Sequence, residues 1–167
     1  SLAPEPMIGT WIPMVDLNRF SANGKTVYTV YNASTSPVRG KLIAVTTVNE
    51  YHVVDLYRYN KIETCTEADK TILCIDLEPR SVTCIAHLPK LLNATLRGPK
   101  LIVQTPENME GAAVRVADRS GTTIAEGKIR NEACELSVPL DAGRLICKLY
   151  RGQYLIDASS FQTARTK

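Results

Sequence analysis

The sequence predicts an all-β protein made of two consecutive antiparallel β-sandwich modules, and three observations lead to this prediction. Its informative segments alternate apolar and polar residues with a period of two, or form short β-branched runs bounded by turn residues. No segment shows a 3.6-residue apolar stripe over three helical turns. A stretch punctuated by Pro89, Gly98 and Pro99 interrupts the pattern and divides the 167 residues into two parts. Each part has the length of one small sandwich.

The first module is expected over residues 1–88. Its strands are predicted at residues 25–31, 40–48, 52–59, 70–77 and 81–88. The first of these strands follows Asn23-Gly24, a dipeptide that favours the two-residue turn of a β-hairpin. Pro79 separates the last two strands, because proline has no N–H group to donate to a strand ladder.

Residues 89–99 are interpreted as a linker, and the second module is expected to be a small Ig-like sandwich over residues 100–167. Its strands are predicted at residues 100–105, 112–117, 122–129, 134–138, 144–150 and 154–158. Turns at intervals of about 8 to 12 residues are typical of a small antiparallel sandwich. One larger sandwich over the whole chain is the alternative.

The composition excludes several classes of function. Lys and Arg number 20 and Asp and Glu 17, a net charge of +3 with both signs interspersed, so no nucleic-acid partner is predicted. The longest purely apolar runs have four residues, which is too short for membrane insertion. Two histidines and five scattered cysteines offer little material for metal or acid–base chemistry.

We expect the chain not to be an enzyme. Glycoside hydrolysis needs two carboxylates that face one substrate, whereas the acidic residues here are spread through turns and solvent-facing positions. Cys84 and His87 lie three residues apart on a predicted strand, so they point to opposite faces. That placement suits neither a zinc site nor a Cys–His nucleophile pair. No metal site and no cofactor are predicted.

The most credible ligand-binding site is an aromatic platform on the strand predicted at residues 52–59. Asp55, Tyr57 and Tyr59 alternate along that strand and are expected to share one face. Flat aromatic rings beside a hydrogen-bonding group suit the apolar face of a pyranose ring. The alternative is that the two tyrosines form cross-strand packing pairs, as tyrosines do in most sheets.

A pattern in the first half resembles a known family. Residues 53–57 (VVDLY) form a strand that ends near an aspartate, and residues 73–85 (LCIDLEPRSVTCI) form alternating apolar positions around a proline corner. Residues 25–88 therefore resemble the C-terminal β-sandwich accessory domain that follows the (β/α)8 catalytic barrel in many glycoside hydrolases. The second half resembles small Ig-like or fibronectin-like modules of bacterial secreted enzymes, through residues 113–121 (AVRVADRSG) and 149–155 (LYRGQYL).

The resemblance implies a non-catalytic accessory region of a larger carbohydrate-active protein. Such a region packs against or positions a catalytic domain and binds glycan weakly. A secreted or cell-envelope location is favoured on the same grounds. The alternative function is an Ig-like cell-surface adhesion or protein-interaction module with no carbohydrate role.

The segment of residues 7–15 (MIGTWIPMV) is unusually apolar. Exposed apolar surface of this extent promotes association, so we expect the segment to be covered. Trp11, Ile12 and Met14 are predicted to dock onto a neighbouring domain of the same polypeptide or onto a protein partner. The alternatives are that the segment packs on its own sandwich as an edge strand, or pairs with a second copy of the chain.

Overall fold

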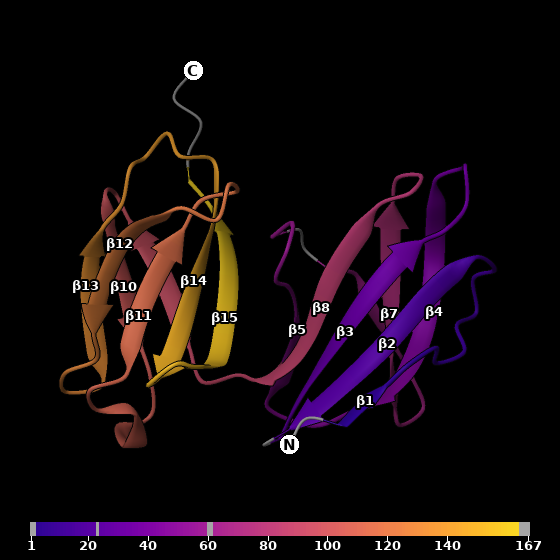
Figure 1. The fold of residues 1–167 in the computed structure, drawn as a ribbon. Coiled ribbons are helices and arrows are strands. Elements are labelled where there is room, and N and C mark those ends of the chain that lie inside the picture. The colour runs from indigo at the N-terminus through magenta and orange to yellow at the C-terminus, as the bar shows by residue number, and fades with distance from the viewer. Residues whose placement is uncertain (1–2, 23, 60–61, 164–167) are drawn as a thin grey trace. The chain divides into compact units, whose positions relative to one another are not determined.

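The computed structural model describes residues 3–22, 24–59 and 62–163, and within them the protein is all-β (Figure 1). The regular elements in these ranges are strands, apart from one 3-10 turn at Glu107–Met109. No helix in the same ranges is long and apolar enough to cross a membrane. The chain divides into two compact units, unit 1 with residues 1–88 and unit 2 with residues 89–167. The predicted fold class is therefore confirmed.

Unit 1 consists of two sheets. The first has five strands in the order β1-β2-β3-β8-β5, and the second has three in the order β4-β7-β6. The strands are β1 (Ala3–Glu5), β2 (Val15–Ala22), β3 (Lys25–Asn32), β4 (Val38–Thr46), β5 (Tyr51–Asp55), β6 (Thr64–Glu67), β7 (Lys70–Leu77) and β8 (Val82–Pro89). The pairs β2–β3, β3–β8, β4–β7 and β6–β7 are antiparallel. Short turns join the strands of β2–β3 and β6–β7, as antiparallel pairing allows.

The core of unit 1 lies between these two sheets. Leu17 of β2 and Ile85 of β8 point inward from the first sheet, and Leu73 of β7 points inward from the second; all three are fully buried. Their inward positions follow the period-two alternation of each strand. Two apolar inner faces that pack together form a β-sandwich.

Residues 6–14 connect the two sheets at one edge. The N–H of Ile8 donates to the carbonyl oxygen of Leu17 on β2 at 2.8 Å, and the N–H of Trp11 donates to that of Leu42 on β4 at 2.9 Å. The Thr10 hydroxyl donates to the carbonyl oxygens of Ile12 and Val15, so the segment's own turn is also held. The segment therefore packs on its own unit, although residues 6–14 form no strand and so do not make the edge strand of the first alternative.

Unit 2 also consists of two sheets, with the strand orders β13-β10-β9 and β12-β11-β14-β15. Fully buried Leu101 and Val103 from the first sheet pack with Val114, Leu145 and Leu149 from the second. The strands are β9 (Asn93–Arg97), β10 (Lys100–Gln104), β11 (Ala113–Ala117), β12 (Thr123–Lys128), β13 (Ala133–Ser137), β14 (Arg144–Arg151) and β15 (Tyr154–Gln162).

The stretch interpreted as a linker differs from that prediction. Residues 93–97 form β9, which pairs along its whole length with β10 in a tight hairpin that includes Gly98 at φ +58°. The chain before β9 is held by Asp157, a fully buried residue of β15. Its carboxylate accepts the N–H groups of Leu91 and Leu92 at 2.8 and 2.7 Å. The second unit therefore begins about ten residues earlier than the sequence pattern indicates.

Candidate functional site

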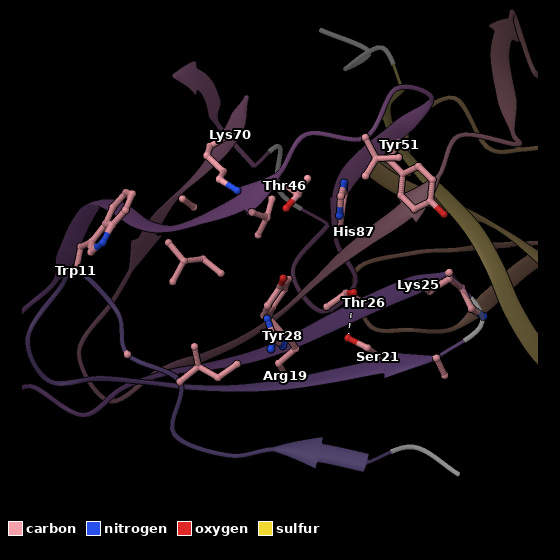
Figure 2. A pocket seen from close by; sticks show the side chains of 18 residues that line it. Trp11, Arg19, Ser21, Lys25, Thr26, Tyr28, Thr46, Tyr51, Lys70 and His87 are labelled. Atoms are coloured by element: carbon pink, nitrogen blue, oxygen red, sulfur yellow. Dashed lines mark hydrogen bonds between the residues drawn. The ribbon is translucent and has the colours of Figure 1, made fainter. Parts of the chain in front are cut away.

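A groove of about 830 Å³ opens in unit 1, where the inner faces of the two sheets become polar (Figure 2). On β2 the inward row runs from buried Val15 and Leu17 to Arg19 and Ser21. Because antiparallel partners share a face, the register extends this polar end to the neighbouring strands. Arg19 lies opposite Tyr28, and Thr26 lies opposite both Ser21 and His87. The hydroxyl oxygens of Ser21 and Thr26 are 3.2 Å apart.

The opposite wall of the groove comes from the second sheet. Ile43 and Val45 of β4 contribute apolar surface, while Thr46 and Lys70 contribute a hydroxyl and an ammonium group. The Trp11 side chain, of which 55% is exposed, lines the groove as well. Figure 2 shows Trp11 at one end of the view and Lys25 at the other, with Lys70 across from Arg19. The groove thus combines one exposed aromatic ring with hydroxyl groups and cations.

Burial and neighbouring groups shift the pKa of several side chains that line the groove. Arg19 forms an ion pair with Glu5 of β1, and this hydrogen bond raises the pKa of the guanidinium. Burial lowers the pKa of the Lys25 ammonium and raises the pKa of the Tyr28 phenol. Burial, with a smaller contribution from nearby His52, lowers the pKa of His87. Partial desolvation at one place is a feature of ligand sites.

Tyr51 of β5 closes one side of the groove. Its ring packs on the imidazole of His87 with a centroid distance of 5.1 Å and a tilt of 59°. Its hydroxyl oxygen lies 3.1 Å from the position that a Cβ would occupy on Gly24, which has φ +74°. Glycine therefore suits the β2–β3 turn through its backbone conformation, and a Cβ at this position would require the Tyr51 hydroxyl to shift by a few tenths of an ångström.

The predicted platform of Asp55, Tyr57 and Tyr59 is not formed as one strand face. Strand β5 ends at Asp55, a buried residue of which only 2% is exposed. Its Oδ1 atom accepts hydrogen bonds from the N–H groups of Tyr57 and Arg58, at 2.9 and 2.8 Å, and from the Thr83 hydroxyl at 2.9 Å. These bonds turn the chain out of the strand. The carboxylate is therefore a turn anchor in this structure.

The two predicted tyrosines are separated by that turn. Tyr59 is buried at 3% exposure with φ +58°, so its ring does not form an open platform. Tyr57 is 60% exposed and lines a second, smaller hollow of about 320 Å³ on unit 1. Tyr31 of β3 lines the same hollow together with Asp16 and Asn18. The two tyrosines that line this hollow are therefore Tyr57 and Tyr31, and Tyr59 does not line it.

The predicted docking residues divide in the same way. Trp11 and Met14 are exposed at 55% and 61%, whereas Ile12 is partly buried against the core of unit 1.

Among the described residues, no group of three or more His, Cys, Asp or Glu side chains is arranged to hold a metal ion. Cys84 and His87 lie opposite Thr29 and Thr26 respectively, positions on different faces of β3.

Arg19, Ser21, Thr26 and His87 were not predicted from the sequence as ligand-binding residues, although a signal for them exists. Arg19 and Ser21 continue the inward parity of β2, whose earlier inward positions are apolar, as in Val15-x-Leu17-x-Arg19-x-Ser21. Thr26 and His87 share the inward parity of buried Tyr28 and Ile85 on β3 and β8. Polar residues at inward positions indicate a place where the two sheets separate.

Comparison with protein-family models and with curated proteins gives no match to this chain.

Proposed function

We propose that this chain is a non-catalytic accessory region of a larger carbohydrate-active protein, and that the groove of unit 1 binds its glycan. The observation that supports this best is the combination of the exposed Trp11 ring with the hydroxyl groups of Ser21, Thr26 and Thr46 in one open groove. An aromatic ring packs on the apolar face of a sugar ring, while hydroxyl groups exchange hydrogen bonds with its edge.

The lining of the groove favours binding over hydrolysis. Among its described residues none is acidic, whereas glycoside hydrolysis generally uses a pair of carboxylates on either side of the scissile bond. His87, the only imidazole among them, is held by Tyr51 and has a lowered pKa. These features suit a site that recognises a saccharide and releases it unchanged.

A glycan array followed by titration calorimetry tests the proposal. The chain is expected to bind at least one oligosaccharide, and Trp11→Ala is expected to weaken binding about tenfold, the value of one ring-stacking contact. Tyr154→Ala removes a 65% exposed aromatic side chain of unit 2 and is the matched control, with unchanged affinity expected. Tyr57→Ala tests whether the glycan binds in the smaller hollow, which Tyr57 lines, instead of in the groove.

Two results would count against the groove. If Tyr57→Ala abolishes binding and Trp11→Ala does not, the glycan occupies the hollow of Tyr57 and Tyr31. If the chain binds no oligosaccharide and captures a protein through Trp11 and Met14, the alternative of a protein-interaction module is favoured. In that case the exposed apolar side chains of Trp11 and Met14 form the docking surface for a neighbouring domain.

A further inference from the structure

We propose that the groove of unit 1 selects an acidic saccharide, one whose sugar rings bear carboxylate or sulfate groups. This inference rests on the proposed function and specifies its ligand class. It follows from which charged side chains the fold places in the groove and which it places elsewhere.

Charge in unit 1 is distributed unevenly. Residues 1–88 contain eight Lys and Arg and nine Asp and Glu, so the unit as a whole is close to neutral. Three of the eight basic side chains line the groove, namely Arg19, Lys25 and Lys70. None of the described residues that line it is acidic. The groove is therefore a basic site on a unit that is not basic.

The acidic neighbours of these cations do not cancel their effect on a ligand. Arg19 pairs with Glu5 through side chains that are 41% and 53% exposed, and an exposed pair contributes at most about 1 kcal/mol. The Lys70 ammonium lies 3.9 Å from a carboxylate oxygen of Asp69, whose side chain is 80% exposed. Water screens both pairs, so a bound anion inside the groove can compete for the same N–H donors.

Once a bound saccharide displaces water from the groove, the walls of the groove strengthen the attraction of an anion. Ile43, Val45 and Tyr28 are buried and form low-dielectric surface beside the cations. Electrostatic interactions are stronger next to such surface than in bulk water, and a cleft of one sign concentrates ligands of the opposite sign. Burial already lowers the pKa of Lys25, which a bound anion would reverse.

The remaining lining groups favour a saccharide over other anions. The hydroxyl groups of Ser21, Thr26 and Thr46 match the neutral hydroxyl groups of a sugar. The exposed Trp11 ring suits the flat face of a pyranose. A polyglutamate peptide would use the cations but offers no flat ring face to the Trp11 side chain.

The test is calorimetric titration of the full chain with matched probes. The probes are hexagalacturonate, its neutral methyl ester, a sulfated hexasaccharide and hexaglutamate. At low salt, at least one acidic saccharide is expected to bind at least about tenfold more tightly than the neutral ester, with an affinity that falls as salt is added. Hexaglutamate is expected to bind more weakly than that saccharide.

The variants Lys25→Gln and Lys70→Gln are each expected to weaken the binding of the acidic saccharide about fivefold. Their affinity for the neutral ester is expected to equal that of the wild type. Lys41→Gln is the matched control, because Lys41 pairs with Glu67 and does not line the groove. Equal changes for Lys41→Gln and Lys70→Gln would overturn the inference, since overall charge would then explain the effect.

The remaining outcomes separate the inference from the proposed function. Equal binding of the acidic and neutral saccharides overturns the acidic selectivity and leaves glycan binding in place. Binding of hexaglutamate as tight as that of the acidic saccharides overturns the saccharide assignment. If none of the saccharides binds here and the glycan array is also negative, both proposals fail.

Discussion

At the scale of single residues, one carboxylate oxygen decides where strand β5 ends. Oδ1 of Asp55 accepts three hydrogen bonds, two of them from the N–H groups of Tyr57 and Arg58. Replacing a buried carboxylate that accepts several hydrogen bonds lowers the stability of the protein, because its donors then lose their partners. The sequence shows an aspartate beside two tyrosines, but it does not show whether the aspartate faces a ligand or its own backbone.

His87 makes the folding stability of the protein depend on pH. Its pKa is lowered in the folded state by burial and by His52, whereas in the unfolded chain it returns to about 6.5. Below pH 6.5 the unfolded chain therefore binds the proton more readily than the folded one. The contribution of His87 to stability is fully present above that pH and decreases as the pH falls through the lowered folded-state value.

Thermal unfolding of the full chain between pH 8 and pH 5 measures this effect. The wild-type melting temperature is expected to fall more over this range than that of His87→Gln. His52→Gln should keep most of the dependence, because His52 makes only the smaller contribution to the shift. Identical pH profiles for the wild type and His87→Gln would show that the imidazole is equally protonated in both states.

At the scale of elements, period-two alternation locates most strands. The segment predicted at residues 25–31 is β3 (Lys25–Asn32), and the segment predicted at residues 70–77 is β7 (Lys70–Leu77). Strand β2 was not predicted, because Arg19 and Ser21 occupy inward positions where an apolar residue is expected. The polar residues that obscure the strand are therefore the ones that line the groove.

Strand β6 (Thr64–Glu67) was not predicted for a different reason. All four of its residues are exposed, so no apolar face marks it in the sequence. Strand β6 pairs with β7 through its backbone, and the Lys41–Glu67 ion pair connects it to β4 on the other side of β7. An edge strand with two polar faces cannot be distinguished from a loop by alternation.

Strand β12 of unit 2 depends on the small size of one residue. A Cβ on Gly127 would lie 2.7 Å from Sγ of Cys134 and 2.9 Å from Cδ2 of Leu136, closer than such atoms pack. Gly127→Ala is therefore expected to destabilise the protein by about 1–3 kcal/mol, the usual effect of overpacking. Chemical denaturation measures this change.

Two further variants make the explanation specific. Gly9→Ala should leave stability unchanged, because the space that its Cβ would enter holds no atom within 4 Å beyond the adjoining residues of the chain. Adding Cys134→Ala to Gly127→Ala should recover part of the loss, because it removes the closest contact. If the free energy of unfolding of Gly127→Ala alone equals that of the wild type, β12 and β13 can move apart to accept the added methyl group without loss of stability.

At the scale of the whole molecule, the boundary between the units is set by contacts distant in sequence. Pro89, Gly98 and Pro99 are typical of a linker, and local pattern gives no reason to place a strand between them. Asp157, at the far end of unit 2, holds the chain just before β9 through its hydrogen bonds to Leu91 and Leu92 and so makes this stretch part of unit 2. Such long-range pairing is not visible in a window of a few residues.

The boundary can be tested with two fragments. Residues 89–167 retain β9, the buried Leu92 side chain and both N–H donors to Asp157, so this fragment is expected to fold with a cooperative thermal transition. Residues 100–167 match the module predicted from the sequence, but they lack all three. Without β9, strand β10 loses one of its two partner strands. Without Leu91 and Leu92, the Asp157 carboxylate loses two hydrogen-bond donors. Together these losses are expected to lower the free energy of unfolding by several kcal/mol, and the total for a domain of this kind is about 10 kcal/mol. The shorter fragment is therefore expected to be unfolded by circular dichroism and amide dispersion. If it instead melts at the same temperature as the longer one, β9 contributes nothing to unit 2 and residues 89–99 are a linker after all.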